Sequence, residues 1–227
     1  MTGAPLPETM RAVVLTGFGG FERLEYRPDW PVPVPGPGEV LIRVGGAGVN
    51  NTDINTRIGW YSKAVEGSTA EGGASGFAEA EGEGWSGTPF TFPRIQGIDA
   101  AGTVMAVGPG VDSSRIGQRV LVEPAWPKTD GTCDFFGSER DGAFAEYTVA
   151  PAVHAHAIDC ALSDLELASF PCAYSTAENL LHRSRVAAGE RVLVTGASGG
   201  VGSAAVQLAH RRGAQVTALA GISKHAA

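Results

Sequence analysis

The chain has 227 residues, of which 43% are hydrophobic and 18% charged, and its formal net charge is −7. This composition is typical of a folded globular protein, and the length allows one large domain or two small ones. The negative charge argues against nucleic acid as a partner, because binding to its phosphates needs a basic face. A local pocket can still bind a phosphate-bearing cofactor.

The sequence gives no indication of a signal peptide, a membrane span or a disulfide framework. No apolar run approaches the roughly 18 residues that a membrane helix needs, and the N-terminus lacks a basic start followed by a long apolar stretch. Cys133, Cys160 and Cys172 contain no CxxC pair, which favours a reducing compartment. We therefore expect a cytoplasmic protein with no membrane partner.

Short β-type runs separated by turn residues extend from Met10 to about Ala157. They cover 11–17, 39–49, 100–108, 118–124 and 142–151, and Pro/Gly-rich turns lie at 31–39 and 108–117. Many short strands with such turns predict a barrel or sandwich-like domain. We place this domain at residues 1–157.

The hydrophobic pattern changes its period after residue 157. Ser163 and Glu166 have capping-box spacing for a short helix, and residues 173–190 have the pattern of a longer one. Residues 191–220 then fit a strand, a glycine turn, a helix and a second strand. The sequence therefore predicts an α/β unit over 158–227, so that the fold class is α/β plus β.

The segment 66–87 is expected to belong to neither part. It contains seven glycines, five glutamates and no lysine or arginine, so it cannot bury enough apolar area to offset its ordering entropy. We predict a flexible surface insertion. The alternative is a lid over a bound substrate, with Phe77 and Trp85 as its apolar anchors.

The stretch VTGASGGVG at 194–202 has the features of a dinucleotide-binding turn. Ala197 replaces the first glycine of the G-x-G-x-x-G fingerprint, Gly199 would let a pyrophosphate approach the backbone, and Gly202 would allow close helix packing. Main-chain N–H groups at the helix start would bind the phosphates. The expected cofactor-binding residues here are Ala197, Ser198, Gly199, Gly200, Val201 and Gly202. The alternative is a tight turn without a ligand.

The residues after the second predicted strand indicate which nucleotide is bound. Sites for NAD place an acidic residue about 20 positions after the turn, where it binds the ribose 2′-hydroxyl. Residues 219–224 read LAGISK, without a carboxylate and with Ser223 and Lys224. A 2′-phosphate would be attracted by Lys224, so NADP(H) is the expected cofactor. The alternative is that Lys224 is a solvated lysine.

Four motifs occur in order along the chain: GVNNTD at 48–53, GID.AG.V.AVG at 97–108, G.RV at 117–120 and GASGGVG at 196–202. Together they resemble the medium-chain dehydrogenase/reductase superfamily, and most closely its zinc-independent quinone-oxidoreductase-like branch. The resemblance implies a GroES-like β-barrel domain followed by the first βαβ part of a Rossmann domain. It also adds Thr176, in PCAYST, to the expected cofactor-binding residues.

Zinc-using relatives carry their catalytic ligands at positions that correspond here to Asn50, Ile98 and Cys172. Only the thiol matches, whereas a catalytic zinc needs about three protein ligands. The structural zinc lobe needs four cysteines and is represented by Cys133 alone. His154 and His156 could share one face of a strand, but no third donor lies nearby in sequence. We therefore expect no bound metal.

Without a metal, hydrogen bonds would polarise the substrate carbonyl. The stretch NNTDINTRIGWY at 50–61 is similar to the pattern of the zinc-free branch. The resemblance implies that Asn50 lies near the nicotinamide or the substrate oxygen, that Asp53 and Arg57 shape the loop as an i, i+4 charge pair, and that Tyr61 donates to a developing enolate. The alternatives are a surface ion pair and an exposed loop aromatic.

The activity that this resemblance implies is NADPH-dependent hydride transfer to a quinone or an α,β-unsaturated carbonyl, by a protein that forms homo-oligomers. The alternatives are a zinc-dependent alcohol dehydrogenase and an inactive fragment that binds nucleotide weakly. Residues after 190 supply one βαβ unit of a sheet that has six strands in the complete fold. We therefore expect an exposed sheet edge and face, weak cofactor binding and little turnover for these 227 residues alone.

Overall fold

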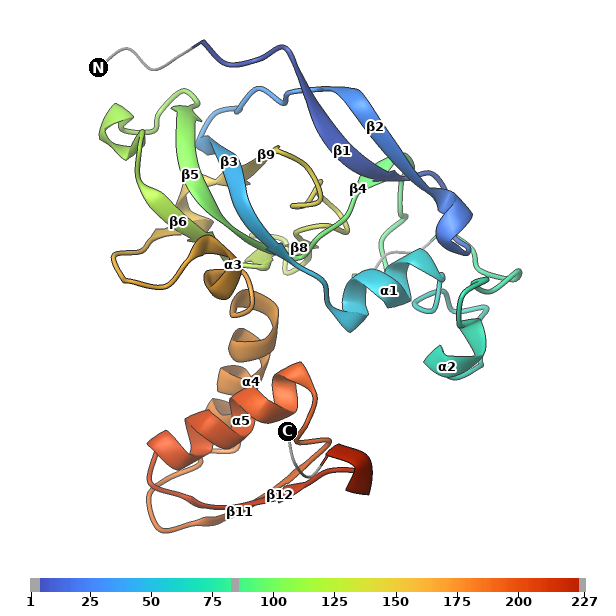
Figure 1. Cartoon of the computed structure of the whole chain (residues 1–227), viewed down its shortest axis with the longest axis vertical. Helices are drawn as coiled ribbons and strands as arrows, with labels where there is room; N and C mark the ends of the chain where they lie inside the picture. The colour runs from blue at the N-terminus through green and yellow to red at the C-terminus, as the bar shows by residue number, and fades with distance from the viewer. Residues whose placement is uncertain (1–4, 83–85, 225–227) are drawn as a thin grey trace. The chain divides into compact units, whose positions relative to one another are not determined.

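The computed structural model describes residues 5–82 and 86–224. The chain divides into two compact units, Met1–Ser169 and Phe170–Ala227. In the first unit a five-stranded sheet has the order β10–β6–β5–β3–β9, and all of its pairings are antiparallel (Figure 1). Its strands are β3 (Glu39–Gly48), β5 (Asp99–Val107), β6 (Arg119–Val122), β9 (Tyr147–Pro151) and β10 (Ala155–Ala157).

Two smaller sheets complete the first unit. A three-stranded sheet has the order β2–β1–β4, with β1 (Thr9–Leu15), β2 (Leu24–Pro31) and β4 (Arg94–Ile95). β7 (Ala125–Pro127) and β8 (Cys133–Phe135) form an antiparallel ribbon. β1 also bonds to the segment that precedes β9, since the N–H of Val13 donates to the carbonyl of Phe144 over 2.8 Å.

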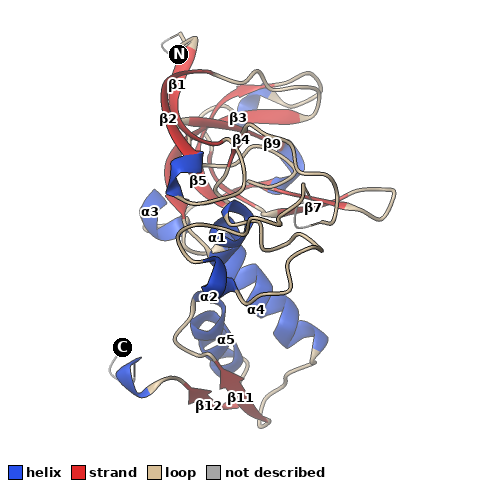
Figure 2. Cartoon of the chain, turned by 90° about the vertical axis from the view of Figure 1, so that its right-hand side faces the viewer, coloured by secondary structure: helices blue, strands red, loops and turns tan. Residues whose placement is uncertain are grey.

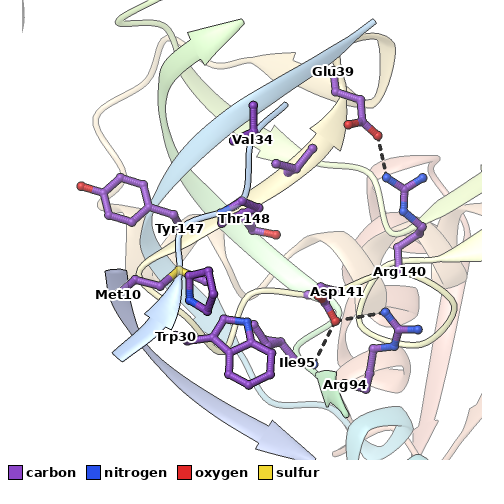
Figure 3. Close-up of a pocket in the computed structure, with 14 residues that line it drawn as sticks. Met10, Trp30, Val34, Glu39, Arg94, Ile95, Arg140, Asp141, Tyr147 and Thr148 are labelled. Atoms are coloured by element: carbon purple, nitrogen blue, oxygen red, sulfur yellow. Dashed lines mark hydrogen bonds and ion pairs between the residues drawn. The ribbon is translucent and has the colours of Figure 1, made fainter. Parts of the chain in front are cut away.

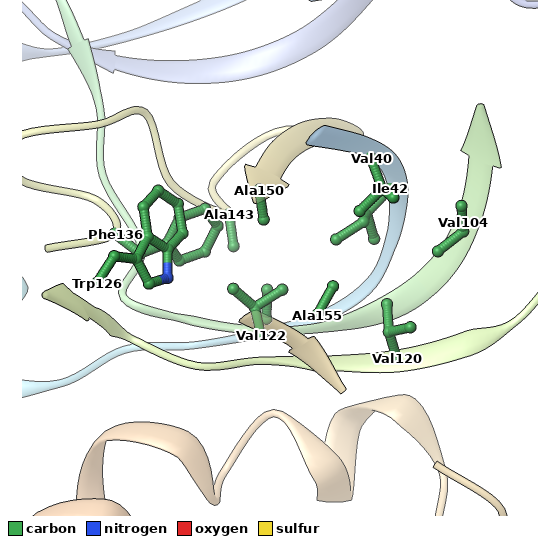
Figure 4. Close-up of a cluster of buried hydrophobic side chains, with 11 residues drawn as sticks. Val40, Ile42, Val104, Val120, Val122, Trp126, Phe136, Ala143, Ala150 and Ala155 are labelled. Atoms are coloured by element: carbon green, nitrogen blue, oxygen red, sulfur yellow. The ribbon is translucent and has the colours of Figure 1, made fainter. Parts of the chain in front are cut away.

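The main core of this unit lies inside the curl of the five-stranded sheet (Figure 4). Branched aliphatic side chains, which suit pleated strands, come from β3, β5 and β6. Trp126 and Phe136 close one end of the cluster, with their ring centroids 5.7 Å apart. The aliphatic members named in the figure from these three strands are Val40, Ile42, Val104, Val120 and Val122.

Three short helices accompany the sheets: α1 (Asn51–Arg57), α2 (Thr69–Gly72) and α3 (Asp164–Leu167). The predicted capping box of α3 is confirmed, since the Ser163 hydroxyl accepts from the Glu166 N–H and the Glu166 carboxylate accepts from the Ser163 N–H. α3 packs against β3 and β5, and Asp164 pairs with Arg119 over 2.6 Å. Residues 158–169 therefore belong with the β-rich unit, although the sequence placed the boundary after residue 157.

The segment 66–87 makes specific contacts with the first unit. The main-chain carbonyl of Gly67 accepts from the Trp60 indole over 3.0 Å. The N–H of Phe77 donates to the carbonyl of Ile58, also over 3.0 Å. Trp85, the second expected anchor, lies outside the described residues, and the flexibility of the segment stays a prediction.

Two expected element boundaries need correction, and one strand was missed. The strand expected at 142–151 begins only at Tyr147, because residues 142–144 instead donate to the carbonyls of residues 95–97. The helix expected at 173–190 is α4 (Pro171–Arg183), which ends before Arg185, a residue with φ of 55°. β2 was missed because Pro28 and its charged neighbours hide the alternation of a strand.

The second unit contains the predicted βαβ arrangement. β11 (Arg191–Thr195) and β12 (Gln215–Leu219) pair in parallel on either side of α5 (Gly200–Arg211). Figure 2 shows α4 and α5 on one side of the two strands. The other face exposes Leu193 and Leu219, at 64% and 57%, as expected for a face that no helix covers. None of the described helices is long and apolar enough to span a membrane.

Candidate functional site

Asp53 fastens the start of α1 to the turn before β5. Its carboxylate accepts from the main-chain N–H groups of Asn50, Gly97 and Ile98 over 2.8, 3.1 and 3.2 Å. The Gln96 side chain donates to the main-chain carbonyl of Asp53 over 2.9 Å. Asp53 is only 6% exposed, so these bonds replace water around the carboxylate.

The environment of Asp53 shifts its titration upward. Burial raises the pKa of the carboxyl to about 6, and the nearby charge of Asp99 acts in the same direction. The three main-chain N–H donors oppose the shift, because they stabilise the ionised form. The carboxyl therefore stays protonated to a higher pH than an exposed aspartate does.

Asn50 links the same helix start to β5. Its side-chain amide donates to Asp99 Oδ2 over 2.7 Å, and Asp99 is 1% exposed. This bond uses one of the two N–H donors of the amide. The second donor is what the expected role of Asn50, a hydrogen bond to a nicotinamide or a substrate oxygen, would require.

The described residues contain no ion pair between Asp53 and Arg57, so the predicted charge pair is wrong. The Arg57 guanidinium instead donates to the main-chain carbonyls of Gly19 and Gly73, over 2.6 and 3.5 Å. It also lies over the Phe21 ring, 4.6 Å from the centroid. Burial lowers the pKa of Arg57, and the charge of Glu22 partly opposes this. Buried main-chain carbonyls need hydrogen-bond donors. The Arg57 guanidinium therefore bonds to the carbonyls of Gly19 and Gly73 rather than to the Asp53 carboxylate.

A cavity of about 560 Å³ lies beside α1 in the first unit, and we call it the α1 cavity. Asp53, Arg57 and Gln96 are its polar side chains, and Gly73 and Ala74 bring the segment 66–87 into its wall. The sequence missed Gln96 and the apolar lining residues, because they come from distant segments. Those apolar residues are Val13, Phe21, Leu24, Val49, Ile54 and Phe144.

Two of the four expected catalytic residues, Asn50 and Tyr61, are not part of this wall. Tyr61 is half-buried and packs edge-on against Trp60, with the ring centroids 5.4 Å apart. It is not among the residues that line the α1 cavity. The structure thus brings Asp53 and Arg57 to one cavity, and the roles of Asn50 and Tyr61 stay predictions.

The glycine turn of the second unit has the geometry of a helix-start cradle. Gly196 has φ of 63°, and Gly199, at the N-cap of α5, donates its N–H to the Gly196 carbonyl over 3.0 Å. A Cβ on Gly202 would lie 2.2 Å from the Gly196 oxygen. The turn therefore requires glycine at 202 for close packing. The N–H groups of the first turn of α5 have no carbonyl partner within the helix.

A second cavity, of about 600 Å³, opens beside this turn, and we call it the turn cavity. Three of the expected cofactor-binding residues, Ala197, Ser198 and Lys224, line it. Ser203 and Gln207 also line it. Their i, i+4 spacing places them on one face of the helix that follows the glycine turn, and this spacing could have been recognised in the sequence. The remaining lining residues are Val206, Ala218 and Ala220.

Six of the nine expected cofactor-binding residues lie outside the lining of the turn cavity. They are Gly199, Gly200, Val201 and Gly202 in the turn itself, together with Thr176 and Ser223. Ser223 is exposed in the short helix 222–224 next to Lys224. The Thr176 hydroxyl donates to the Cys172 carbonyl one turn earlier in α4, over 2.7 Å. Their roles in cofactor binding stay predictions.

Within the described residues, no group of three or more His, Cys, Asp or Glu side chains is placed to bind a metal. His154 and His156 nevertheless have a third polar neighbour that sequence spacing did not reveal. Both contact Oε2 of Glu123, over 2.8 and 3.3 Å, because β10 pairs with β6. Burial raises the pKa of Glu123, but the hydrogen bonds from the two imidazoles outweigh it, so that the pKa lies below its ordinary value.

Residues 36–159, more than half of the chain, match the family model for the alcohol dehydrogenase GroES-like domain. Human quinone oxidoreductase is 33% identical over 213 residues, which cover 93% of this chain and 53% of that protein. The chain belongs to the medium-chain dehydrogenase/reductase superfamily, in its quinone-oxidoreductase-like branch. It spans about half the length of the curated relatives that it matches.

Solved structures support the same fold. A putative alcohol dehydrogenase from Sinorhizobium meliloti is 48% identical with a TM-score of 0.84, over 97% of this chain and 60% of that one. An NAD-dependent alcohol dehydrogenase is 32% identical with a TM-score of 0.77, over 94% of this chain and 59% of that one. The predicted fold, a GroES-like domain followed by the first part of a Rossmann domain, is confirmed.

Proposed function

We propose that this protein is an oxidoreductase that uses NADP(H) to reduce a quinone or an α,β-unsaturated carbonyl without a metal ion. The observation that carries the proposal is the lining of the turn cavity. It combines Ala197 and Ser198 of the glycine turn with one ammonium group, on Lys224, and its lining residues include no carboxylate. A 2′-phosphate on the adenosine ribose fits such a lining better than it fits an acidic one.

The residues of the turn fit a dinucleotide. Gly199 is exposed, its φ is an ordinary −82°, and a Cβ there would lie 3.4 Å from the nearest atom, the Gly196 oxygen. The packing of the chain therefore does not require glycine at 199, whereas close approach of a pyrophosphate would. The first-turn N–H groups of α5 would then bind the phosphates. When bound, the nicotinamide group supplies the hydride.

The α1 cavity supports a flat, apolar substrate. Its wall is largely apolar. Arg57 donates two of its five N–H groups to the main-chain carbonyls of Gly19 and Gly73. A remaining donor on the guanidinium would bind a carbonyl oxygen of the substrate. The Asp53 carboxylate accepts three main-chain N–H bonds, so we give it a positioning role rather than that of a proton donor.

The residues at the zinc-ligand positions support a reaction without metal. The Asn50 amide donates to Asp99, and Ile98 is a buried alkyl side chain. Neither supplies a thiolate or an imidazole, the donors that zinc prefers alongside carboxylates. Carbonyl polarisation would then rest on hydrogen bonds.

The experiment compares NADPH and NADH binding to the wild type and to Lys224→Ala, by fluorescence titration. Loss of one charge-assisted contact to the 2′-phosphate should weaken NADPH binding about tenfold and leave NADH binding unchanged. Arg211→Ala, at the other end of α5, is the matched control. Equal affinities of the wild type for the two nucleotides would contradict the NADP(H) assignment.

A second assay tests the reaction itself. NADPH oxidation is followed with a panel of quinones and enones, with and without a chelator. Turnover that survives the chelator supports the proposal, and turnover that the chelator abolishes and added zinc restores would replace it with the zinc-dependent alternative. Formation of a homo-oligomer also stays a prediction, which light scattering after gel filtration checks.

A further inference from the structure

Arg57 carries a buried positive charge whose partners are all uncharged. The residue is 5% exposed. In the described part of the chain its guanidinium contacts the main-chain carbonyls of Gly19 and Gly73 and the ring of Phe21. Arginine is rarely buried to this extent without an anionic partner. A buried charge without a counter-charge costs free energy, and a suitable anion would reduce that cost.

The arginines that line another cavity of the first unit each have a carboxylate partner. In that cavity Arg140 pairs with Glu39 over 2.5 Å, and Arg94 pairs with Asp141 over 3.0 Å (Figure 3). The charges of its wall are therefore balanced within the fold. Arg57 differs from both arginines, because no carboxylate of the described residues forms an ion pair with it.

Two acidic residues near Arg57 leave its charge largely uncompensated. Asp53 lines the same cavity, but its carboxylate accepts three main-chain N–H bonds and makes no ion pair with Arg57. The charge of Glu22 does act on Arg57. The Glu22 side chain is nevertheless 67% exposed, and its carboxylate lies 3.8 Å from Nε of Arg23. Solvent and a second cation therefore screen the charge of Glu22.

The charged end of Arg57 lies at the wall of the α1 cavity. Phe21 and Gly73, two of the three partners of the guanidinium, line this cavity themselves, which places the guanidinium rather than the aliphatic stem at the wall. Its two hydrogen bonds use two of five N–H groups. The rest of the wall is largely apolar, and the volume of about 560 Å³ lies in the range of small-molecule sites.

We propose that the α1 cavity binds an amphipathic carboxylate, whose carboxylate group pairs with Arg57 and whose apolar body packs against the apolar wall. Hydrogen bonds between ionised partners are roughly twice as strong as neutral ones, so this position favours a carboxylate over a ketone oxygen. The inference rests on the proposed function in assigning the cavity to the substrate. That substrate is then a quinone or an enone with a free carboxylate, and its reducible carbonyl lies elsewhere on the molecule.

Octanoate, octan-1-ol and octylammonium are the probes, because they share one apolar chain and differ in charge. Calorimetric titration of the full chain without nucleotide measures their affinities, and the Ile54 methyl resonance reports binding at the α1 cavity. Octanoate should bind with a dissociation constant on the order of 0.1 mM, about tenfold more tightly than octan-1-ol, and octylammonium should bind most weakly. Equal affinities of octanoate and octan-1-ol, tightest binding of octylammonium, or no shift at Ile54 overturns the proposal.

Arg57→Met removes the charge and should abolish the preference for octanoate over octan-1-ol. Arg23→Met, at a residue outside the cavity lining, should keep it. Ile54→Glu and Ile54→Gln form a second pair that does not depend on the folding of Arg57→Met, since Ile54 is 42% exposed. Octanoate should bind Ile54→Glu about fivefold more weakly than Ile54→Gln, and octan-1-ol should bind both alike. A preference that persists in Arg57→Met, or equal octanoate affinities of the two Ile54 variants, contradicts the proposal.

A turnover assay separates this inference from the proposed function. With NADPH, 3-benzoylacrylate, an enone with a free carboxylate, should have a kcat/KM about tenfold above that of its methyl ester. Equal values for the acid and the ester refute the carboxylate preference and leave the oxidoreductase activity standing. Absence of NADPH oxidation with both compounds counts against the proposed function. The octanoate titrations contain no nucleotide, so they decide in that case whether the cavity binds a carboxylate.

Discussion

Alanine at Gly202 and alanine at Gly199 should separate what the glycine turn does for the fold from what it does for a nucleotide. A Cβ at 202 would lie 2.2 Å from the Gly196 oxygen and 2.8 Å from the Cα of Ala197, both main-chain atoms. Overpacking of this kind costs about 1–3 kcal/mol, and the better helix propensity of alanine returns about 1 kcal/mol. We therefore expect Gly202→Ala to lower the free energy of unfolding of the second unit by up to about 2 kcal/mol.

Gly199→Ala should behave differently, because its Cβ meets only the Gly196 oxygen at 3.4 Å. Its stability should stay within about 1 kcal/mol of the wild type, while the affinity for NADPH falls about tenfold or more, since the methyl group occupies the phosphate approach. Urea denaturation, hydrogen exchange in residues 191–219 and NADPH titration measure these effects. Equal destabilisation by the two variants, or unchanged nucleotide affinity in Gly199→Ala, would refute the reasoning.

The pH dependence of stability and the anchoring of the segment 66–87 are also testable. The pKa of Asp53 is about 6 in the folded chain and 3.8 ordinarily. Between these pH values the folded state binds more protons than the unfolded state does. This group should therefore lower the unfolding free energy by up to about 3 kcal/mol as the pH rises from 4 to 7. Urea titrations should show this slope in the wild type, and its persistence in Asp53→Asn would contradict the assignment. Arg57→Met should lower stability by about 2–3 kcal/mol, because the carbonyls of Gly19 and Gly73 lose their donor, and should speed hydrogen exchange in 66–82. Arg27→Met, which removes an exposed ion pair with Asp29, should change stability by less than about 1 kcal/mol, and a larger effect there than at Arg57 would be evidence against the anchor.

Elements with a strong local pattern could be predicted from the sequence. The runs 39–49 and 100–108 match β3 and β5 to within about a residue, because alternating apolar side chains and flanking Gly/Pro turns identify a strand without tertiary information. The βαβ arrangement of the second unit followed in the same way from the glycine turn and its flanking periods. By contrast, β4 (Arg94–Ile95) is formed by pairing with β1, and two residues carry no period of their own.

The partners of the site residues could not be predicted, because they come from distant parts of the chain. The i, i+4 rule suggested that Asp53 would pair with Arg57, and it applies to exposed helix faces. Both side chains are buried, where unsatisfied main-chain groups compete for them. Residues 97–98 and Gly19 contact α1 only through the tertiary fold. The Glu123 contact with the two histidines depended in the same way on the register of β6 and β10.

Asp53 shows why a shifted pKa beside a cavity does not by itself mark an acid catalyst. A perturbed carboxyl in a cavity is a reasonable functional candidate, and Asp53 lines the α1 cavity with a pKa of about 6. Its three hydrogen bonds nevertheless all come from main-chain donors, and protonation would weaken each of them. The raised pKa thus results from burial of a carboxyl group whose hydrogen bonds hold α1 against the turn at 96–98. Arg57, in the same helix, is held in place with it. The titration of Asp53 should accordingly appear in the stability of the fold and in substrate affinity, rather than as a proton-transfer step in turnover.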